Sequence, residues 1–266
     1  MSGPQTLGYV QVAIATALVI LAGGVSLALK LGLERRLLWA ALRTIVQLLL
    51  IGYVLKFIFG LDHPAAVLGI SLVMVAAAAH AAIGRSEKTF AGLYGLSFLA
   101  LVASSLITTT VVTQGVIRID PWFKPQYVIP LLGMILGNAL TGISLCLDHL
   151  LQELKDRRAE VEMELSHGAT RWEAAKRPLS DAVRRGMIPI INAMTVVGIV
   201  SLPGMMTGQI LSGTDPLEAV KYQIVVMFMV AAAAAMGSMF VALLVYRRLF
   251  NNRHQLCWQV IQDKPK

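Results

Sequence analysis

Charged side chains are scarce in this sequence. Asp, Glu, Lys and Arg make up 14% of its 266 residues, whereas 56% of the residues are hydrophobic. Soluble domains carry about 25% charged residues. A large soluble core of buried helices therefore explains the long apolar runs poorly, and each run is near the roughly 20 residues that cross a bilayer. The composition predicts an all-α polytopic membrane protein.

Seven apolar runs are expected to be transmembrane helices. They cover residues 6–29, 37–58, 65–83, 91–113, 127–147, 187–211 and 222–246. The first run is longer than the apolar region of a secretory signal peptide, and no Lys or Arg precedes it in this sequence. We therefore expect it to be a retained span.

The net charge of +8 is distributed as in a membrane protein rather than as in a nucleic-acid-binding protein. If the spans alternate, 18 of the 23 Lys and Arg residues fall on one side. Cytosolic loops of membrane proteins carry this excess of positive charge. The pattern predicts an N-terminus outside the cell and a C-terminus in the cytosol.

Motifs for catalysis and metal binding are missing. The sequence has no G-x-x-x-x-G-K-[ST] loop for nucleotide phosphates, no G-x-S-x-G and no H-E-x-x-H. Its two cysteines and five histidines form no spacing typical of a metal or redox site, and no Asp or Glu lies inside a predicted span. We expect no enzymatic activity and no bound cofactor in this chain alone, and the sequence leaves any metal ligands unknown.

One long polar segment, residues 148–185, joins the fifth and sixth spans. Its first part continues span five as a helix, because Leu147, Leu151, Leu154, Val161 and Leu165 recur at helical spacing. Glu153 and Arg157 form an i,i+4 pair of the favourable order. Gly168 offers a left-handed end to this helix.

A second helix follows at once. Thr170 and Glu173 have the spacing of a capping box, and Pro178 predicts that the helix ends near Arg177. The resulting two turns present Trp172 among charged residues, which suits an anchor in a protein interface. The alternative is a solvated loop with a chance cap.

Polar residues inside the spans indicate a possible substrate path. Arg43 and Gln47 lie in the second span and Asn138 in the fifth, where Gly133 and Gly137 would also let helices approach closely. Arg43 could instead extend to the cytosolic interface, and ordinary helix packing would account for the others.

The sixth span contains a break. Pro203-Gly204 interrupts its helical pattern, and broken helices commonly mark substrate sites in transporters. The residues that we expect to border the path there are Asn192, Met205, Met206 and Gln209. A simple kink near the outer end of the span is the alternative.

Two stretches carry a resemblance to a known family. Residues 164–213, ELSHGATRWEAAKRPLSDAVRRGMIPIINAMTVVGIVSLPGMMTGQILSG, and residues 42–55, LRTIVQLLLIGYVL, resemble the membrane permease subunit of the bacterial ABC-type iron exporter family, which is related to plant aluminium-sensitivity proteins. The resemblance implies a homodimer in the bacterial inner membrane, beside two copies of a separate ATPase that binds ATP and Mg. It also implies export of iron or another metal species.

The resemblance gives the polar segment a role. ABC permeases place a cytosolic coupling helix in a groove of the ATPase, and Glu162 and Gly168 match the first part of the general signature, although its later Ile-x-Leu-Pro is not matched. We expect residues 1–250 to form one permease domain, with 148–185 as coupling segment and 251–266 as a cytosolic tail. The expected ATPase-coupling residues are Glu162, Gly168, Thr170, Arg171, Trp172, Glu173 and Lys176.

Two other functions fit the same sequence. An ion-coupled secondary transporter would also have many spans and a broken helix, but such carriers usually use an intramembrane Asp, Glu or His relay. A non-transporting receptor or assembly subunit would show no flux with any partner. Ferric iron prefers oxygen ligands, which the spans offer only in neutral form, so the identity of the substrate stays open.

Overall fold

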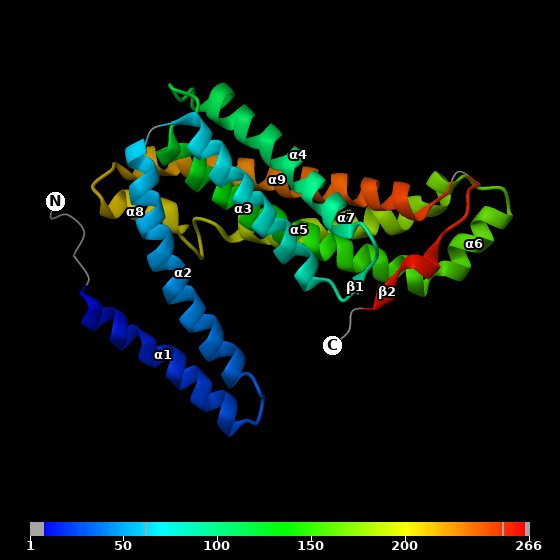
Figure 1. The fold of residues 1–266 in the computed structure, drawn as a ribbon, viewed down its shortest axis with the longest axis horizontal. Coiled ribbons are helices and arrows are strands. Elements are labelled where there is room, and N and C mark those ends of the chain that lie inside the picture. Colours follow the sequence, from blue (N-terminus) through cyan, green and yellow to red (C-terminus); the bar gives the residue numbers. More distant parts are fainter. Residues whose placement is uncertain (1–7, 62, 252, 264–266) are drawn as a thin grey trace.

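The computed structural model describes residues 8–61, 63–251 and 253–263. Helices account for nearly all of this part of the chain (Figure 1). They are α1 (Tyr9–Ala28), α2 (Glu34–Leu61), α3 (Pro64–Arg85), α4 (Leu93–Thr110), the π-helix η1 (Val111–Val116), α5 (Pro125–Asp156), α6 (Arg158–Ser166), α7 (Arg171–Val196), α8 (Gly204–Leu211) and α9 (Pro216–Leu249). A 3₁₀ turn, η2 (Trp258–Val260), and two short strands, β1 (Lys88–Thr89) and β2 (Gln262–Asp263), complete the described elements.

Six of the described helices are long and apolar enough to cross a membrane, namely α1 to α5 and α9. This confirms an all-α, multi-pass membrane protein. The predicted span at 187–211 is divided between the end of α7 and the short helix α8, so it is not one continuous helix.

The predicted end of a helix near Arg177 is wrong. Helix α7 continues from Arg171 to Val196 with Pro178 and Pro189 inside it. Each proline removes one N–H donor, which alone would disfavour the helix by about 3 kcal/mol or more. Pro178 is buried, and α7 packs along both α5 and α9, so tertiary contacts hold this helix together.

The core lies where α5, α7 and α9 cross, with α3 and α4 alongside (Figure 1). The helices approach closely at glycine: a Cβ atom added to Gly186 of α7 would lie 2.7 Å from the carbonyl oxygen of Gly142 in α5 and 2.6 Å from Ser238 Oγ in α9. The expected close contact at Gly133 and Gly137 is wrong within the described chain. A Cβ on Gly137 would meet nothing within 4 Å, and one on Gly133 would make an ordinary contact with Met74.

Helices α1 and α2 form a hairpin that stands apart from this core (Figure 1). Helix α2 is exposed along most of its length, and Ile58 near its end packs with Val67 of α3 and Ile129 of α5. Arg43 and Gln47 are both exposed on α2. The hairpin is therefore tied to the rest of the molecule at one end.

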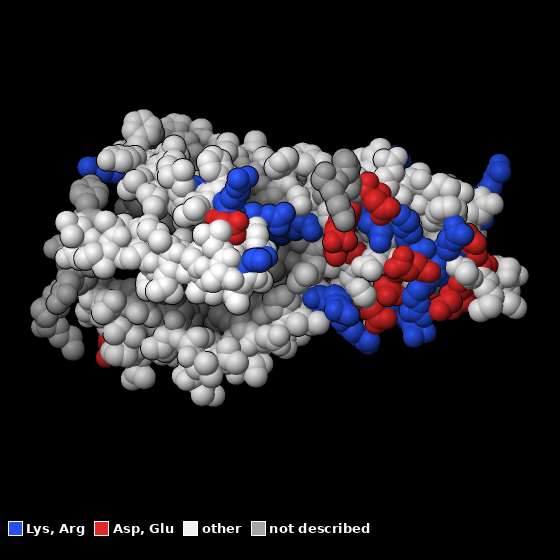
Figure 2. All heavy atoms as spheres, turned by 90° about the horizontal axis from the view of Figure 1, so that it is seen from below, with Lys and Arg blue, Asp and Glu red and all other residues white. Residues whose placement is uncertain are grey.

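Charged side chains are dense at one end of the molecule, the end that carries α6 (Figure 2). We call this the charged end; it is the end that the distribution of Lys and Arg predicts to be cytosolic. The C-terminal segment folds back here, where β2 pairs with β1 in antiparallel fashion and Lys155 Nζ lies 2.7 Å from Asp263 Oδ2. Leu256 and Ile261 of this segment are buried in the same core as α5 and α9.

Candidate functional site

The corner between α5 and α6 is held by ion pairs at the charged end. Helix α5 runs to Asp156, and Arg157 interrupts the helical pattern with φ −102° and ψ 22°. Its guanidinium lies 3.2 Å from Glu153 Oε2, as the sequence predicted, and 2.5 Å from Glu160 Oε2. Leu147, Leu151, Leu154 and Val161 are all buried, so the predicted apolar face of this segment is confirmed.

The turn from α6 into α7 is closed on both sides by local hydrogen bonds. Gly168 adopts φ +92°, and the N–H groups of Gly168 and Ala169 donate to the carbonyls of Leu165 and Glu164, both at 3.1 Å. This is the left-handed end that the sequence predicted. We call residues 162–176 the coupling turn; its conformation is set by these bonds and by those of the next helix.

The capping box at the start of α7 is also confirmed. The Thr170 N–H donates to Glu173 Oε2 at 2.8 Å, and the Glu173 N–H donates to Thr170 Oγ1 at 3.3 Å. The hydrogen bonds from the backbone N–H and then the hydroxyl of Thr170 lower the pKa of Glu173. The capping box therefore favours the ionised form of Glu173.

One face of the coupling turn is buried and the other is exposed. Ala174 and Ala175 pack into the core, whereas the expected coupling residues Glu162, Gly168, Thr170, Trp172, Glu173 and Lys176 are exposed. Trp172 is 48% exposed, and its ring packs edge-on against Tyr246 of α9 at 5.5 Å between centroids. Met163 of α6 is 55% exposed and was missed, because a single methionine in a charged helix carries no distinctive sequence signal.

The C-terminal segment braces the coupling turn, and Arg171 faces this segment. The Arg171 N–H donates to His254 Nδ1 at 2.9 Å, and its guanidinium donates to the Asn251 carbonyl at 3.4 Å. The Arg158 guanidinium lies 4.2 Å from the centre of the Trp258 ring. No sequence pattern indicated these contacts, since they join residues about 80 to 100 positions apart.

The predicted break in the sixth span is confirmed, and it begins earlier than expected. Helix α7 ends at Val196, Val197 is extended, and Gly198 adopts φ +83°. The Gly198 N–H donates to the Ser201 carbonyl at 2.9 Å, which closes a small loop before Pro203 caps α8. The left-handed glycine, rather than Pro203-Gly204, ends the helix.

A cavity of about 420 Å³ adjoins this loop; we call it the break cavity. Met194, Met206 and Met227 line it from α7, α8 and α9, together with Phe228 and Gln223 of α9. Gln223 is 6% exposed, and its Oε1 atom has no hydrogen-bond partner among the described residues. Gln223 was missed, because a single amide side chain in an apolar helix cannot be told from an ordinary packing residue by sequence alone.

The expected path residues are only partly brought together. Met206 lines the break cavity, Met205 packs against the core, and Gln209 has a buried Oε1 atom without a hydrogen-bond partner. Asn192 is exposed on α7. Asn138 is exposed on α5 with its amide donating to the Met134 carbonyl, and Arg43 and Gln47 lie on the separate hairpin.

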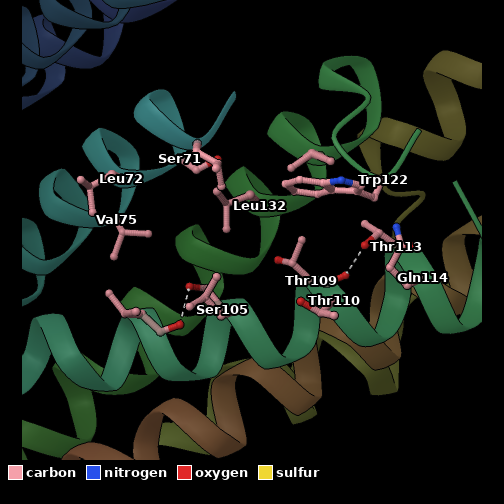
Figure 3. Close-up of a pocket in the computed structure, with 14 residues that line it drawn as sticks. Ser71, Leu72, Val75, Ser105, Thr109, Thr110, Thr113, Gln114, Trp122 and Leu132 are labelled. Carbon is pink, nitrogen blue, oxygen red and sulfur yellow. Dashed lines mark hydrogen bonds between the residues drawn. The ribbon is translucent and has the colours of Figure 1, made fainter. Parts of the chain in front are cut away.

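A second cavity, of about 450 Å³, lies between α3, α4 and α5, and Trp122 lines one end of it (Figure 3). Serine and threonine hydroxyls of α3, α4 and η1 line it, among them Ser71, Ser105, Thr109 and Thr113. We call it the hydroxyl cavity. It was missed because serine and threonine in apolar helices usually bond to their own backbone, so their sequence pattern does not mark a cavity. Among the described residues, no three His, Cys, Asp or Glu side chains are grouped as a metal site requires.

Comparison with known proteins decides the family. The family model described as Uncharacterised protein family (UPF0014) matches residues 9–250. The chain belongs to this family. No solved structure matches it.

Several relatives within the family are similar over almost their whole length. The chain is 40% identical to the probable iron export permease protein FetB of Escherichia coli K12 over 255 residues, which is 96% of each chain. It is 37% identical to the UPF0014 membrane protein YjkA of Bacillus subtilis, covering 94% of this chain and 98% of that one. It is 34% identical to the protein ALUMINUM SENSITIVE 3 of Arabidopsis thaliana, covering 94% and 90%. The suspected family is therefore confirmed.

Proposed function

We propose that this chain is the permease subunit of an ABC exporter in the bacterial inner membrane, driven by an ATPase that is a separate chain. The E. coli relative is named a probable iron export permease and matches this chain from end to end, which supports export of iron or another metal species. The sequence has no phosphate-binding loop, so ATP and Mg would bind to the partner.

The observation that carries this proposal is the continuity of α7. This single helix of 26 residues joins the coupling turn to the loop beside the break cavity. At 1.5 Å per residue it is about 39 Å long. Its close contacts with Gly142 and Ser238 hold it against α5 and α9. A displacement of the coupling turn by a partner would therefore be passed to the break as a movement of a rigid element.

The exposed face of the coupling turn is where we place the ATPase. Trp172 and Met163 are exposed apolar side chains of the coupling turn, and Glu162, Glu173 and Lys176 are exposed charged ones. An aromatic anchor with a charged rim is the usual composition of a protein interface. Arg171 would act differently, by fixing the turn to the C-terminal segment.

The break cavity is the proposed substrate path. Its methionines and amide are neutral, and a bare ferric ion would lose its preferred oxygen ligands there. The lining therefore favours a metal species that brings its own ligands. A second copy of the chain is placed against the α1–α2 hairpin, because Arg43 and Gln47 are exposed on α2 and hydrocarbon is a poor partner for both.

Co-purification with an ATPase tests the proposal. The tagged chain should retain an ATP-binding-cassette subunit in equal ratio, and ATPase activity should require both chains. The variant Trp172→Ala, Lys176→Ala should lose the partner while still folding in detergent, with a lower melting temperature because the Trp172–Tyr246 ring contact is lost. Both side chains are at the surface, so these substitutions are safer than deleting residues 170–176, which would remove the buried Ala174 and Ala175. Retention of the partner and its activity by this variant would contradict the placement of the interface.

A further inference from the structure

The hydroxyl cavity has one polar end and one apolar end. Thr109, Thr110, Thr113 and Gln114 gather beneath the Trp122 indole at one end, and Leu72 and Val75 lie at the other (Figure 3). The polar end comes from the last turn of α4 and from η1, close to the loop that leaves the predicted membrane region. The cavity is therefore amphipathic along its length.

Most hydroxyl groups of this cavity already donate a hydrogen bond to a backbone carbonyl of the preceding helical turn. Ser71, Ser105 and Thr113 donate to the carbonyls of Val67, Val102 and Thr109 at 2.7, 3.2 and 2.8 Å. Ser71 is partly exposed, whereas Ser105 and Thr113 are buried. The Thr109 hydroxyl oxygen is buried and has no hydrogen-bond partner in the described part of the chain, which sets it apart from these neighbours. A ligand that both donates and accepts hydrogen bonds would satisfy this group.

The π-helix shapes this wall. In η1 the Ile117 N–H donates to the Val112 carbonyl, five residues back, at 2.9 Å. The wider turn places Thr113 and Gln114 on the cavity wall together with Thr109 and Thr110. Such π-helical turns are rare, and they occur frequently at functional sites.

Among the described residues that line the hydroxyl cavity, none carries a charged side chain. A ligand with a full charge would therefore be buried without a counter-ion, which is strongly unfavourable. We propose that this cavity binds a neutral amphiphile. Its uncharged, hydrogen-bonding head would lie among Thr109, Thr110 and Gln114, and its apolar body against Leu72 and Val75.

The size of the cavity supports this ligand class. About 450 Å³ is within the range of roughly 300–1,000 Å³ for small-molecule sites, which are typically apolar with a few polar groups that fix orientation. The hydroxyl cavity shares no lining residue with the break cavity. The proposal therefore does not depend on which molecule the break cavity carries.

Quenching of Trp122 fluorescence provides the test. A variant with Trp39, Trp172 and Trp258 changed to Phe leaves Trp122 as the reporter at the end of the cavity. In phosphatidylcholine nanodiscs, a monoacylglycerol with a dibrominated chain should quench it saturably, and unbrominated monoacylglycerol should reverse the quenching. A brominated lysophosphatidate and a brominated alkylammonium should bind at least about tenfold more weakly.

Isosteric substitutions show whether the hydroxyls bind the head. Thr109→Val with Thr110→Val should weaken the neutral probe about tenfold. Thr108→Val is the matched control, since its hydroxyl donates to the Ser104 carbonyl inside the core and does not line the cavity. Quenching that rises linearly with probe concentration, that unbrominated monoacylglycerol does not reverse, or that is equal in both variants would mean that Trp122 senses bulk lipid. Tighter binding of a charged probe would refute a neutral ligand. If the double variant does not fold, competition between brominated and unbrominated monoacylglycerol in the protein that keeps its native threonines still shows whether the cavity binds this ligand.

Discussion

Substitution of Gly186 by alanine is the sharpest test of how α7 is held. The added Cβ would lie 2.6 Å from Ser238 Oγ, 2.7 Å from the Gly142 carbonyl oxygen and 3.1 Å from Cys146 Cβ. The serine hydroxyl could rotate away, but the backbone oxygen could not, so α7 has to separate from α5. Overpacking of this kind costs about 1–3 kcal/mol, against a gain of roughly 0.5–1 kcal/mol from the better helix propensity of alanine. We expect a net loss of stability and a larger loss of coupled transport.

Gly137→Ala is the matched control for this experiment. Gly137 lies in the middle of α5, and a Cβ there would meet nothing within 4 Å, so only the propensity gain applies. Thermal unfolding of both purified variants in the same detergent gives the comparison. Gly186→Ala should melt below the unmodified protein and Gly137→Ala at or above it. Equal melting temperatures for the two variants would refute the close crossing of α5, α7 and α9.

Three further predictions follow from single side chains. Trp172→Ala should weaken ATPase binding by about 2 kcal/mol, measured by titration of the partner, whereas Trp172→Phe should keep most of the affinity. Unchanged affinity in Trp172→Ala would place the ring outside the interface. The folded-state pKa of Glu173 is lowered, so its contribution to stability is present above the unfolded value of about 4.3 and is lost as pH falls through the folded value. Acid should therefore expose the coupling turn to pepsin in the native chain, with a weaker pH dependence in Glu173→Gln, and an identical dependence in both would contradict the capping role. Gln223→Leu removes a buried oxygen that has no hydrogen-bond partner among the described residues, so it should raise the free energy of unfolding by about 1–3 kcal/mol. It should also reduce transport, and unchanged transport would mean that the break cavity is not part of the substrate path.

Local signals in the sequence predicted local structure well. The Thr170–Glu173 capping box, the left-handed Gly168 and the Glu153–Arg157 pair each depend on residues three to five positions apart, and all are present. Apolar run length likewise predicted the membrane helices, because a bilayer requires about 20 apolar residues whatever lies next to them.

Features that depend on tertiary contacts could not be predicted in the same way. Pro178 was expected to end a helix, but burial between α5 and α9 retains the helix despite the lost hydrogen bond. The close contact of Gly142, Gly186 and Ser238 joins three helices that are far apart in the sequence, and none of the three lies in the G-x-x-x-G pattern at Gly133. The hydroxyl cavity arises from the combined faces of three helices and the π-helical turn, for which no sequence motif exists.

The central claim is that a partner ATPase moves the coupling turn and that α7 passes this movement to the break. Hydrogen–deuterium exchange tests it most directly, with the chain measured alone, with the co-purifying ATPase, and with ATPase plus a non-hydrolysable ATP analogue. We predict protection of residues 162–176 when the ATPase binds, and a further change at residues 197–203 only when the nucleotide is added. Unchanged exchange at 162–176 in the complex, or a nucleotide response that never reaches 197–203, would contradict the account.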